Sequence, residues 1–197
     1  DQPRSRGLGD VYKRQALIYA NKVKNEISKH YNKEIIIKEI NTTGDNKIDI
    51  RLSELGGKGL FSKNIENELL NKNIDLAVHA LKDLPSFDTE GLVTNCFLKR
   101  NNSNEVMISN SNKKLNDLVP GSIVGTSSFR REFQLKRIRK DLNFKLIRGN
   151  VDTRIRKLKS GEYDAIILAK AGLSSLNLEK EITQEFSNND LIPSAGQ

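Results

Sequence analysis

The sequence predicts an α/β fold with mostly parallel strands, and two observations support this expectation. Segments rich in β-branched residues alternate with segments whose apolar residues recur every three or four positions. Small polar residues or glycines directly follow several of the predicted strands, as is typical where a strand leads into a helix. At 197 residues, the chain is long enough for one large domain or two small ones.

The first half is expected to contain two helices and three strands. Residues 1–15 lack a clear period and are expected to be a non-native or disordered tail. A helix follows from Ala16, the polar segment 41–55 is predicted to be a loop, and a second helix starts near Leu60 or Phe61. The predicted strands are 34–40, 74–80 and 92–98.

Two strand–turn–helix units are predicted between Gly121 and Arg154. In the first, the strand at 122–124 runs into Gly-Thr-Ser-Ser and a basic helix at 130–140. In the second, the strand at 144–147 runs into Arg-Gly-Asn and a helix that a Ser-Gly pair ends. Two further strands are predicted at 105–109 and 163–169.

The charge of the chain is concentrated in one segment. The formal net charge is +8, from 33 basic and 25 acidic residues. Twelve Lys or Arg and only three acidic residues lie between Phe129 and Lys159, so this segment carries the positive field and its partner should be anionic.

Other features of the composition predict a cytoplasmic protein. A single cysteine, Cys96, excludes an internal disulfide bond and fits a reducing compartment. The two histidines and the cysteine are widely spaced and give no metal-ligand pattern. The apolar runs are far shorter than the roughly 20 residues that cross a bilayer, so no membrane partner is expected.

The two predicted turns form the strongest candidate site. Their basic residues are Arg130, Arg131, Arg148 and Arg154. Helix starts present unpaired backbone N–H groups and the positive end of the helix dipole, so two adjacent turns could bind an anion with several negative groups. Taken alone, Thr126, Ser127 and Ser128 would be an ordinary N-cap. Adjacent cations at a helix start instead indicate a bound anion that offsets them.

The first half offers weaker candidates with two interpretations each. Lys82 and Asp83 follow a predicted strand, and form either a surface turn or a rigid carboxylate that stabilises a developing cation or donates a proton. Lys58 lies among three glycines and is either a solvated loop residue or part of a mobile lid. His79 is expected to pack in the sheet, and Cys96 in the core.

The basic helix also raises the alternative of nucleic-acid binding. Few aromatic residues lie near it, and no nucleic-acid-binding motif is present. We therefore favour a small acidic ligand and expect no nucleic-acid partner. A non-catalytic module that binds small anions remains the second interpretation.

Several motifs, in matching order and spacing, closely resemble the porphobilinogen deaminase family, also called hydroxymethylbilane synthase. They are GGKGLF (56–61), VHALKDLP (78–85), VGTSSFRR (124–131), LIRGNVDTR (146–154), YDAIILAKAGL (163–173) and IPSAGQ (192–197). The resemblance covers about residues 16–197. It implies a transferase of tetrapyrrole biosynthesis that joins four porphobilinogens into a linear tetrapyrrole and releases ammonia at each step. It also implies a dipyrromethane cofactor, attached to a cysteine, that primes the growing chain.

The resemblance implies a three-domain fold. Its first two domains resemble type II periplasmic binding proteins with a cleft between them, and the third carries the cofactor cysteine. Here the first domain would comprise residues 16–98 plus 190–197, and the second residues 99–189. The third domain would be absent, so the resemblance implies a truncated and inactive chain. We expect a monomer whose partner is porphobilinogen.

Functional residues follow from the matching motifs. Asp83 would be the catalytic carboxylate that contacts pyrrole nitrogens and stabilises the cationic azafulvene, and Lys58 would lie on a mobile loop. The residues expected to bind the acetate and propionate groups of cofactor and substrate, or to lie near the cofactor, are Lys82, Thr126, Ser127, Ser128, Arg130, Arg131, Arg148, Gly149, Arg154 and Gln197.

The chain also departs from the family pattern. A Thr-Arg-x-Ser motif is replaced by residues that include Asp10, Val11 and Lys13, and Ser175 stands where the family often has arginine.

Overall fold

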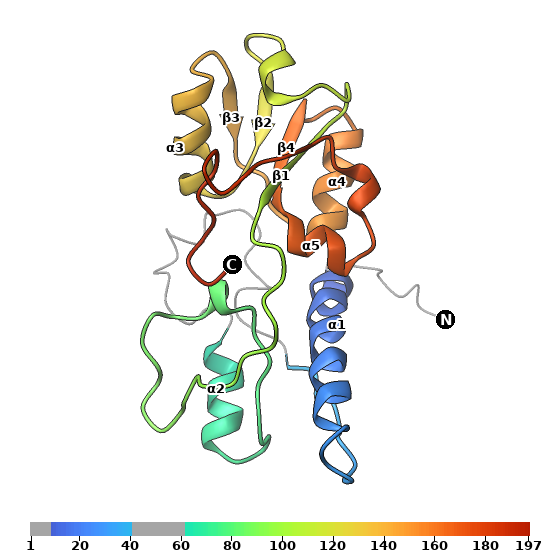
Figure 1. Ribbon diagram of the computed structural model, residues 1–197, viewed down its shortest axis with the longest axis vertical. Helices are drawn as coiled ribbons and strands as arrows, with labels where there is room; N and C mark the ends of the chain where they lie inside the picture. The colour runs from blue at the N-terminus through green and yellow to red at the C-terminus, as the bar shows by residue number, and fades with distance from the viewer. Residues whose placement is uncertain (1–8, 41–61) are drawn as a thin grey trace, which may run out of the picture. The chain divides into compact units, whose positions relative to one another are not determined.

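The computed structural model describes residues 9–40 and 62–197 (Figure 1). The chain divides into two compact units, one reaching to Arg100 and including Gly196, the other comprising Asn101–Ala195 and Gln197. Residues 190–195, expected in the first domain, are grouped with the second unit. The reason is apolar packing, because Leu191 is fully buried in the core of that unit.

The described part of the first unit is helical. It contains α1 (Gly9–Ile27), α2 (Lys63–Leu70) and the short 3-10 helix η3 (Leu81–Asp83). Helix α1 begins within the expected tail, so residues 9–15 are helical rather than disordered, and a non-native origin of this segment stays a prediction. No glycine or proline interrupts residues 10–27, and the helix therefore extends back to Gly9.

The three strands predicted in this unit do not form. Residues 34–40, 74–80 and 92–98 have no strand assignment, and the ladder pairs of the described chain all belong to the second unit. Ile36 and Phe97 are largely exposed, and Cys96, predicted to be in the core, is also exposed. β-branched residues favour a pleated, half-buried surface, but a strand exists only where a partner supplies its hydrogen bonds.

The second unit contains one five-stranded sheet with the order β3-β2-β4-β1-β5. Its strands are β1 (Glu105–Ser109), β2 (Ile123–Gly125), β3 (Asn143–Lys145), β4 (Ala165–Ala169) and β5 (Gln184–Glu185). Strand β2 is parallel to β3 and β4, whereas β1 is antiparallel to β4 and β5. The sheet is mixed rather than mostly parallel, because only β2, β3 and β4 are joined by helical crossovers.

Helices α3 (Phe129–Ile138) and α4 (Val151–Lys159) flank this sheet (Figure 1). Alternate residues of β4 face two separate clusters, in which Ile167 packs with Leu135 of α3 and Ile166 packs with Ile155 of α4. The predicted helices and the strand at 105–109 are therefore confirmed in this unit. Its remaining short helices are η4 (Leu115–Asp117), α5 (Lys170–Ser175) and η5 (Glu179–Glu181).

The register places the two predicted turns at one edge of the sheet. Gly125 pairs with Lys145 between parallel β2 and β3, and Thr126 N donates to Lys145 O at 3.1 Å. Glu105, the first residue of antiparallel β1, pairs with Ala169, the last residue of β4. Because β4 is parallel to β2, residues from four strands meet at this edge. Over the ranges 9–40 and 62–197, no helix combines the length and apolarity needed to cross a membrane.

Candidate anion-binding site

The turn between β2 and α3 is built by its own hydroxyl groups. Thr126 is fully buried, and its Oγ1 accepts a hydrogen bond from Ser128 N at 3.1 Å. Ser128 is the N-cap of α3, and its Oγ accepts a hydrogen bond from Arg131 N at 3.4 Å. Ser127 between them is half-buried. The N-cap interpretation of this turn is therefore confirmed, and Thr126 adds a second internal bond.

The two arginines of this turn share one carboxylate. Glu105 Oε1 lies 2.5 Å from Arg130 Nη2, and Glu105 Oε2 lies 2.7 Å from Arg131 Nη2. Arg130 also donates to the carbonyl of Ile192, and Arg131 Nη1 donates to Ile167 O at 3.2 Å. Both cations therefore have a partner within the protein, contrary to the expectation that only a bound anion offsets them. Glu105 supplies a negative charge from within the protein.

Sequence reasoning missed Glu105 because it treated residues 105–109 as an apolar strand. The signal was present, since a carboxylate at the head of the segment Glu-Val-Met-Ile-Ser is unusual in a strand that is buried throughout. Acidic residues are almost never fully buried unless they are paired. A search for the partner of this carboxylate would have led to the arginines.

The turn between β3 and α4 is fixed by a close contact of Gly149 with Thr153 and by hydrogen bonds from neighbouring residues. Gly149 has φ of +109°, and a Cβ there would lie 2.6 Å from Thr153 Cγ2. Asn150 caps α4, and its Oδ1 accepts a hydrogen bond from Thr153 N at 2.8 Å. Arg154 Nε donates to Gly149 O at 2.7 Å, and Arg148 is buried beside the turn. Asn150 is a second residue that sequence reasoning did not single out.

Both turns contain buried side-chain N–H donors. Within the described residues, neither Arg131 Nε nor Asn150 Nδ2 has a hydrogen-bond partner. Buried polar atoms are nearly always satisfied, so such donors indicate a missing acceptor. A carboxylate supplies acceptor oxygens only, and therefore matches these donors. These donors suit a carboxylate chemically, although two of the arginines at this edge are already paired.

Lys82 and Asp83 form η3 in the first unit, where the chain turns tightly. Asp83 N donates to Ala80 O at 2.9 Å, and a Cβ on Gly196 would lie 2.9 Å from the Lys82 nitrogen. Surrounding protein atoms raise the pKa of Asp83, whereas the charges of Lys82 and His79 oppose that rise. The Asp83 side chain is nevertheless exposed at the surface, so its pKa rise comes from the many protein atoms nearby rather than from full exclusion of solvent.

The other residues singled out from the sequence do not lie in the two turns. His79 is half-buried and burial lowers its pKa, but residues 74–80 form no strand, so its expected packing in a sheet is not found. Gln197 Nε2 donates to Ser103 O at 2.7 Å in the second unit. Ser175 Oγ donates to Gly172 O at 3.0 Å within its own helix. Lys58 lies outside the described residues. In those residues, no group of three or more His, Cys, Asp or Glu could hold a metal ion.

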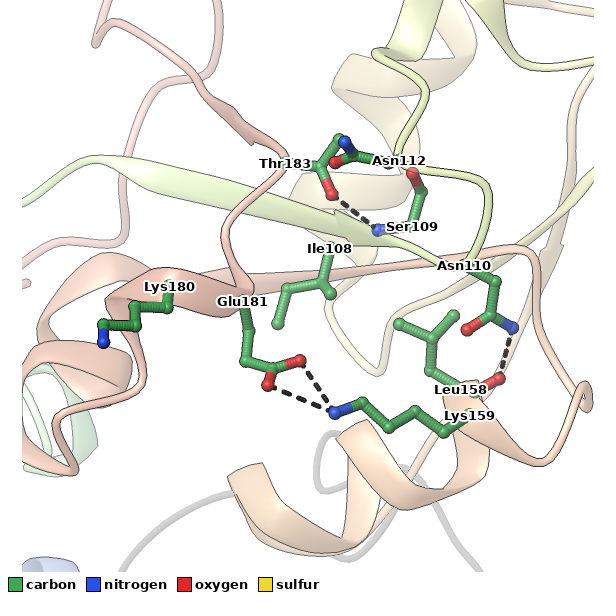
Figure 2. A pocket seen from close by; sticks show the side chains of 9 residues that line it. All are labelled: Ile108, Ser109, Asn110, Asn112, Leu158, Lys159, Lys180, Glu181 and Thr183. Carbon is green, nitrogen blue, oxygen red and sulfur yellow. Dashed lines mark hydrogen bonds and ion pairs between the residues drawn. The ribbon is translucent and has the colours of Figure 1, made fainter.

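A separate pocket of about 360 Å³ lies at the far end of β1 from Glu105 (Figure 2). Lys159 Nζ and Glu181 Oε2 pair at 2.9 Å beside it, and Ser109 N donates to Thr183 Oγ1 at 3.1 Å. Its lining contains none of the predicted site residues. Because these polar groups already bond to one another, the pocket is a weaker candidate than the two turns.

Comparison with known proteins identifies the family. The family described as "Porphobilinogen deaminase, dipyromethane cofactor binding domain" matches residues 13–197. The chain belongs to the porphobilinogen deaminase family. It is 51% identical over 174 residues to "Porphobilinogen deaminase" of Bacillus pumilus (strain SAFR-032), a match that covers 88% of this chain and 55% of the relative.

Two further relatives show similar identity and slightly lower coverage. The porphobilinogen deaminases of Geobacillus kaustophilus (strain HTA426) and Bacillus subtilis (strain 168) are 49% and 48% identical over 162 residues. Each match covers 82% of this chain and 52% of the relative. The chain therefore spans about half the length of these curated relatives. The resemblance found in the motifs is confirmed at the level of the family.

Proposed function

We propose that the chain is the cofactor- and substrate-binding part of a hydroxymethylbilane synthase. This transferase would join four porphobilinogen molecules into a linear tetrapyrrole and release one ammonia at each step. The observation that supports the proposal is the pair of helix-start turns at one sheet edge, with their arginines and unsatisfied N–H donors. Each pyrrole of such a product brings two carboxylates, and a charge-assisted hydrogen bond contributes about 1.5–3 kcal/mol.

The donor groups fit a dipyrromethane cofactor with carboxylate side chains. Arg131 Nε and Asn150 Nδ2 lack acceptors, and Gly149 leaves no room for a side chain beside Thr153. When bound, the dipyrromethane would supply the primer to which the first substrate pyrrole is joined. The residues proposed to bind its carboxylates and those of the substrate are Lys82, Thr126, Ser127, Ser128, Arg130, Arg131, Arg148, Gly149, Arg154 and Gln197.

We propose Asp83 as the catalytic residue. A carboxylate that is partly shielded from water attracts a nearby cation more strongly than one in bulk solvent. It would therefore stabilise the positive charge that forms as ammonia leaves porphobilinogen. The raised pKa of Asp83 also favours proton transfer to the departing amine, because a general acid works best near the operating pH.

The other expectations stay predictions. They include the arrangement of two domains like type II periplasmic binding proteins, with boundaries at 16–98 plus 190–197 and at 99–189. They also include the lid role of Lys58, a monomeric state and a cytoplasmic location. The internal pairing of Arg130 and Arg131 with Glu105 leaves less charge for a polyanion, so nucleic-acid binding is not proposed.

Substitution of Asp83 tests the proposed activity. In the complete protein, Asp83→Ala should lower turnover of porphobilinogen at least a hundredfold, the usual range for loss of an acid–base group. Ammonia release and tetrapyrrole absorbance measure this turnover. Asp88→Ala, which removes an exposed aspartate of the same unit, is the matched control. The proposal fails if the unsubstituted protein forms no tetrapyrrole, or if Asp83→Ala retains the turnover of Asp88→Ala.

A further inference from the structure

Glu105 is an acidic side chain that the proposed function does not use. It is fully buried at the first position of β1, between β4 and β5. Its backbone is fixed on both sides, because it pairs with Ala169 and its carbonyl accepts a hydrogen bond from Phe186 N at 2.9 Å. The carboxylate therefore extends from one of the most rigid parts of the unit.

The carboxylate orients two guanidinium groups. Glu105 Oε1 accepts a hydrogen bond from Arg130 Nη2 at 2.5 Å, and Glu105 Oε2 forms an ion pair with Arg131 Nη2 at 2.7 Å. Guanidinium is planar with five donors in a fixed fork, so fixing one edge sets the direction of the others. Arg131 Nε is among the donors left without a partner. The direction in which this donor points is therefore set by Glu105 together with the Ile167 carbonyl, which accepts a hydrogen bond from Arg131 Nη1 at 3.2 Å.

The positive charges of Arg130 and Arg131 also require the Glu105 carboxylate beside them. Two adjacent cations at the start of α3 repel each other and oppose the helix dipole. The Arg131 side chain is only 10% exposed, and a buried charge without a partner is strongly destabilising. One carboxylate shared by two arginines leaves a net charge of +1 at this turn. That charge suits one carboxylate of a ligand without leaving two close cations unbalanced.

We propose that Glu105 is a positioning residue of the anion site, which holds Arg130 and Arg131 in the orientation that accepts a pyrrole carboxylate. This inference rests on the proposed function. Glu105 itself does not touch the ligand, because its oxygens face the two arginines. Its removal should weaken carboxylate binding while leaving the chemistry at Asp83 unaffected.

Equilibrium binding to the complete protein tests this role. The probe is a pyrrole with acetate and propionate side chains but no aminomethyl group, which cannot release ammonia and so is not turned over. Isothermal titration calorimetry should give a Kd at least tenfold higher for Glu105→Gln, since one oriented charge-assisted bond is lost. Glu105→Asp keeps the charge but shortens the reach, so its Kd should lie between those of the wild type and Glu105→Gln.

The control is Asp141→Asn, which removes a carboxylate 2.5 Å from Arg139 Nη2. Asp141 precedes β3, at the strand end opposite the second turn, so its loss should leave the probe Kd unchanged. Calorimetry also separates positioning from folding, because misfolded protein lowers the number of binding sites but not the Kd of the rest. If Glu105→Gln does not fold, Glu105→Asp replaces it, with an expected threefold or greater rise in Kd.

The outcomes distinguish this inference from the proposed function. Probe binding by the wild type, with Glu105 variants equal to Asp141→Asn, overturns the positioning role and leaves the proposed activity intact. Absence of both probe binding and porphobilinogen turnover in the wild type overturns both. Probe binding with weakened Glu105 variants but no turnover supports the positioning role and removes the proposed activity.

Discussion

Gly149 and Thr153 lie so close that a Cβ on the glycine would be 2.6 Å from Thr153 Cγ2. This contact closes the turn between β3 and α4, where Asn150 caps the helix and Arg154 donates to the Gly149 carbonyl. The close approach and the positive φ of Gly149 both require glycine. The second turn of the candidate site is therefore fixed by sterics as well as by hydrogen bonds.

Gly149→Ala should destabilise the protein more than Gly161→Ala. Both positions have positive φ, which costs a residue with a side chain about 1–2 kcal/mol. Only Gly149 adds a steric overlap, because nothing lies within 4 Å of a Cβ on Gly161. Overpacking costs about 1–3 kcal/mol, and this is the expected difference between the variants. Urea unfolding followed by circular dichroism measures it, and equal losses would contradict the steric argument.

The two helix caps should differ in strength. Asn150→Ala removes a 2.8 Å bond to Thr153 N, and is expected to cost about 0.5–2 kcal/mol, the usual range for a cap. Ser128→Ala removes a longer bond of 3.4 Å to Arg131 N and should cost less. The free energy of unfolding of each variant gives the comparison. A larger loss for Ser128→Ala would show that its hydroxyl has a further structural role.

Two positions on α3 give a matched test of the core. Leu135 is fully buried in the cluster beneath this helix, whereas Phe133 is 67% exposed. Leu135→Ala should lower the free energy of unfolding by about 2–5 kcal/mol, through lost transfer energy and the cavity left behind. Phe133→Ala, although it removes more atoms, should change it by about 0.5 kcal/mol or less. Comparable losses would mean that the exposed face of α3 is covered in solution.

The raised pKa of Asp83 predicts that this residue makes the stability of the protein depend on pH. Burial favours the neutral carboxyl, so its contribution to stability is full below the ordinary Asp range near pH 4 and is lost as pH rises through the folded-state pKa. Asp83→Asn should therefore gain melting temperature over the wild type as pH rises, and match it at low pH. Asp88→Asn corrects for the general loss of one negative charge. A difference independent of pH would contradict a raised pKa.

Local signals in the sequence predicted the second unit well. Apolar periodicity and capping residues placed the bounds of the strand–turn–helix units within two residues, because caps and turns depend on neighbours along the chain. Motif resemblance identified the family, which the match over residues 13–197 confirms. The same signals failed at 34–40, 74–80 and 92–98, because a strand needs a pairing partner that local composition does not reveal.

The sequence by itself determined the family, the concentration of positive charge and the two turns that follow β2 and β3. Only the tertiary structure decided how that charge is balanced. Glu105 lies 25 residues before Arg130 in the chain, yet its carboxylate contacts both arginines because β1 runs antiparallel beside β4. Charge compensation depends on distances in space rather than along the chain. The arginine pair that the sequence presented as unpaired is therefore a partly neutralised cluster with a defined orientation.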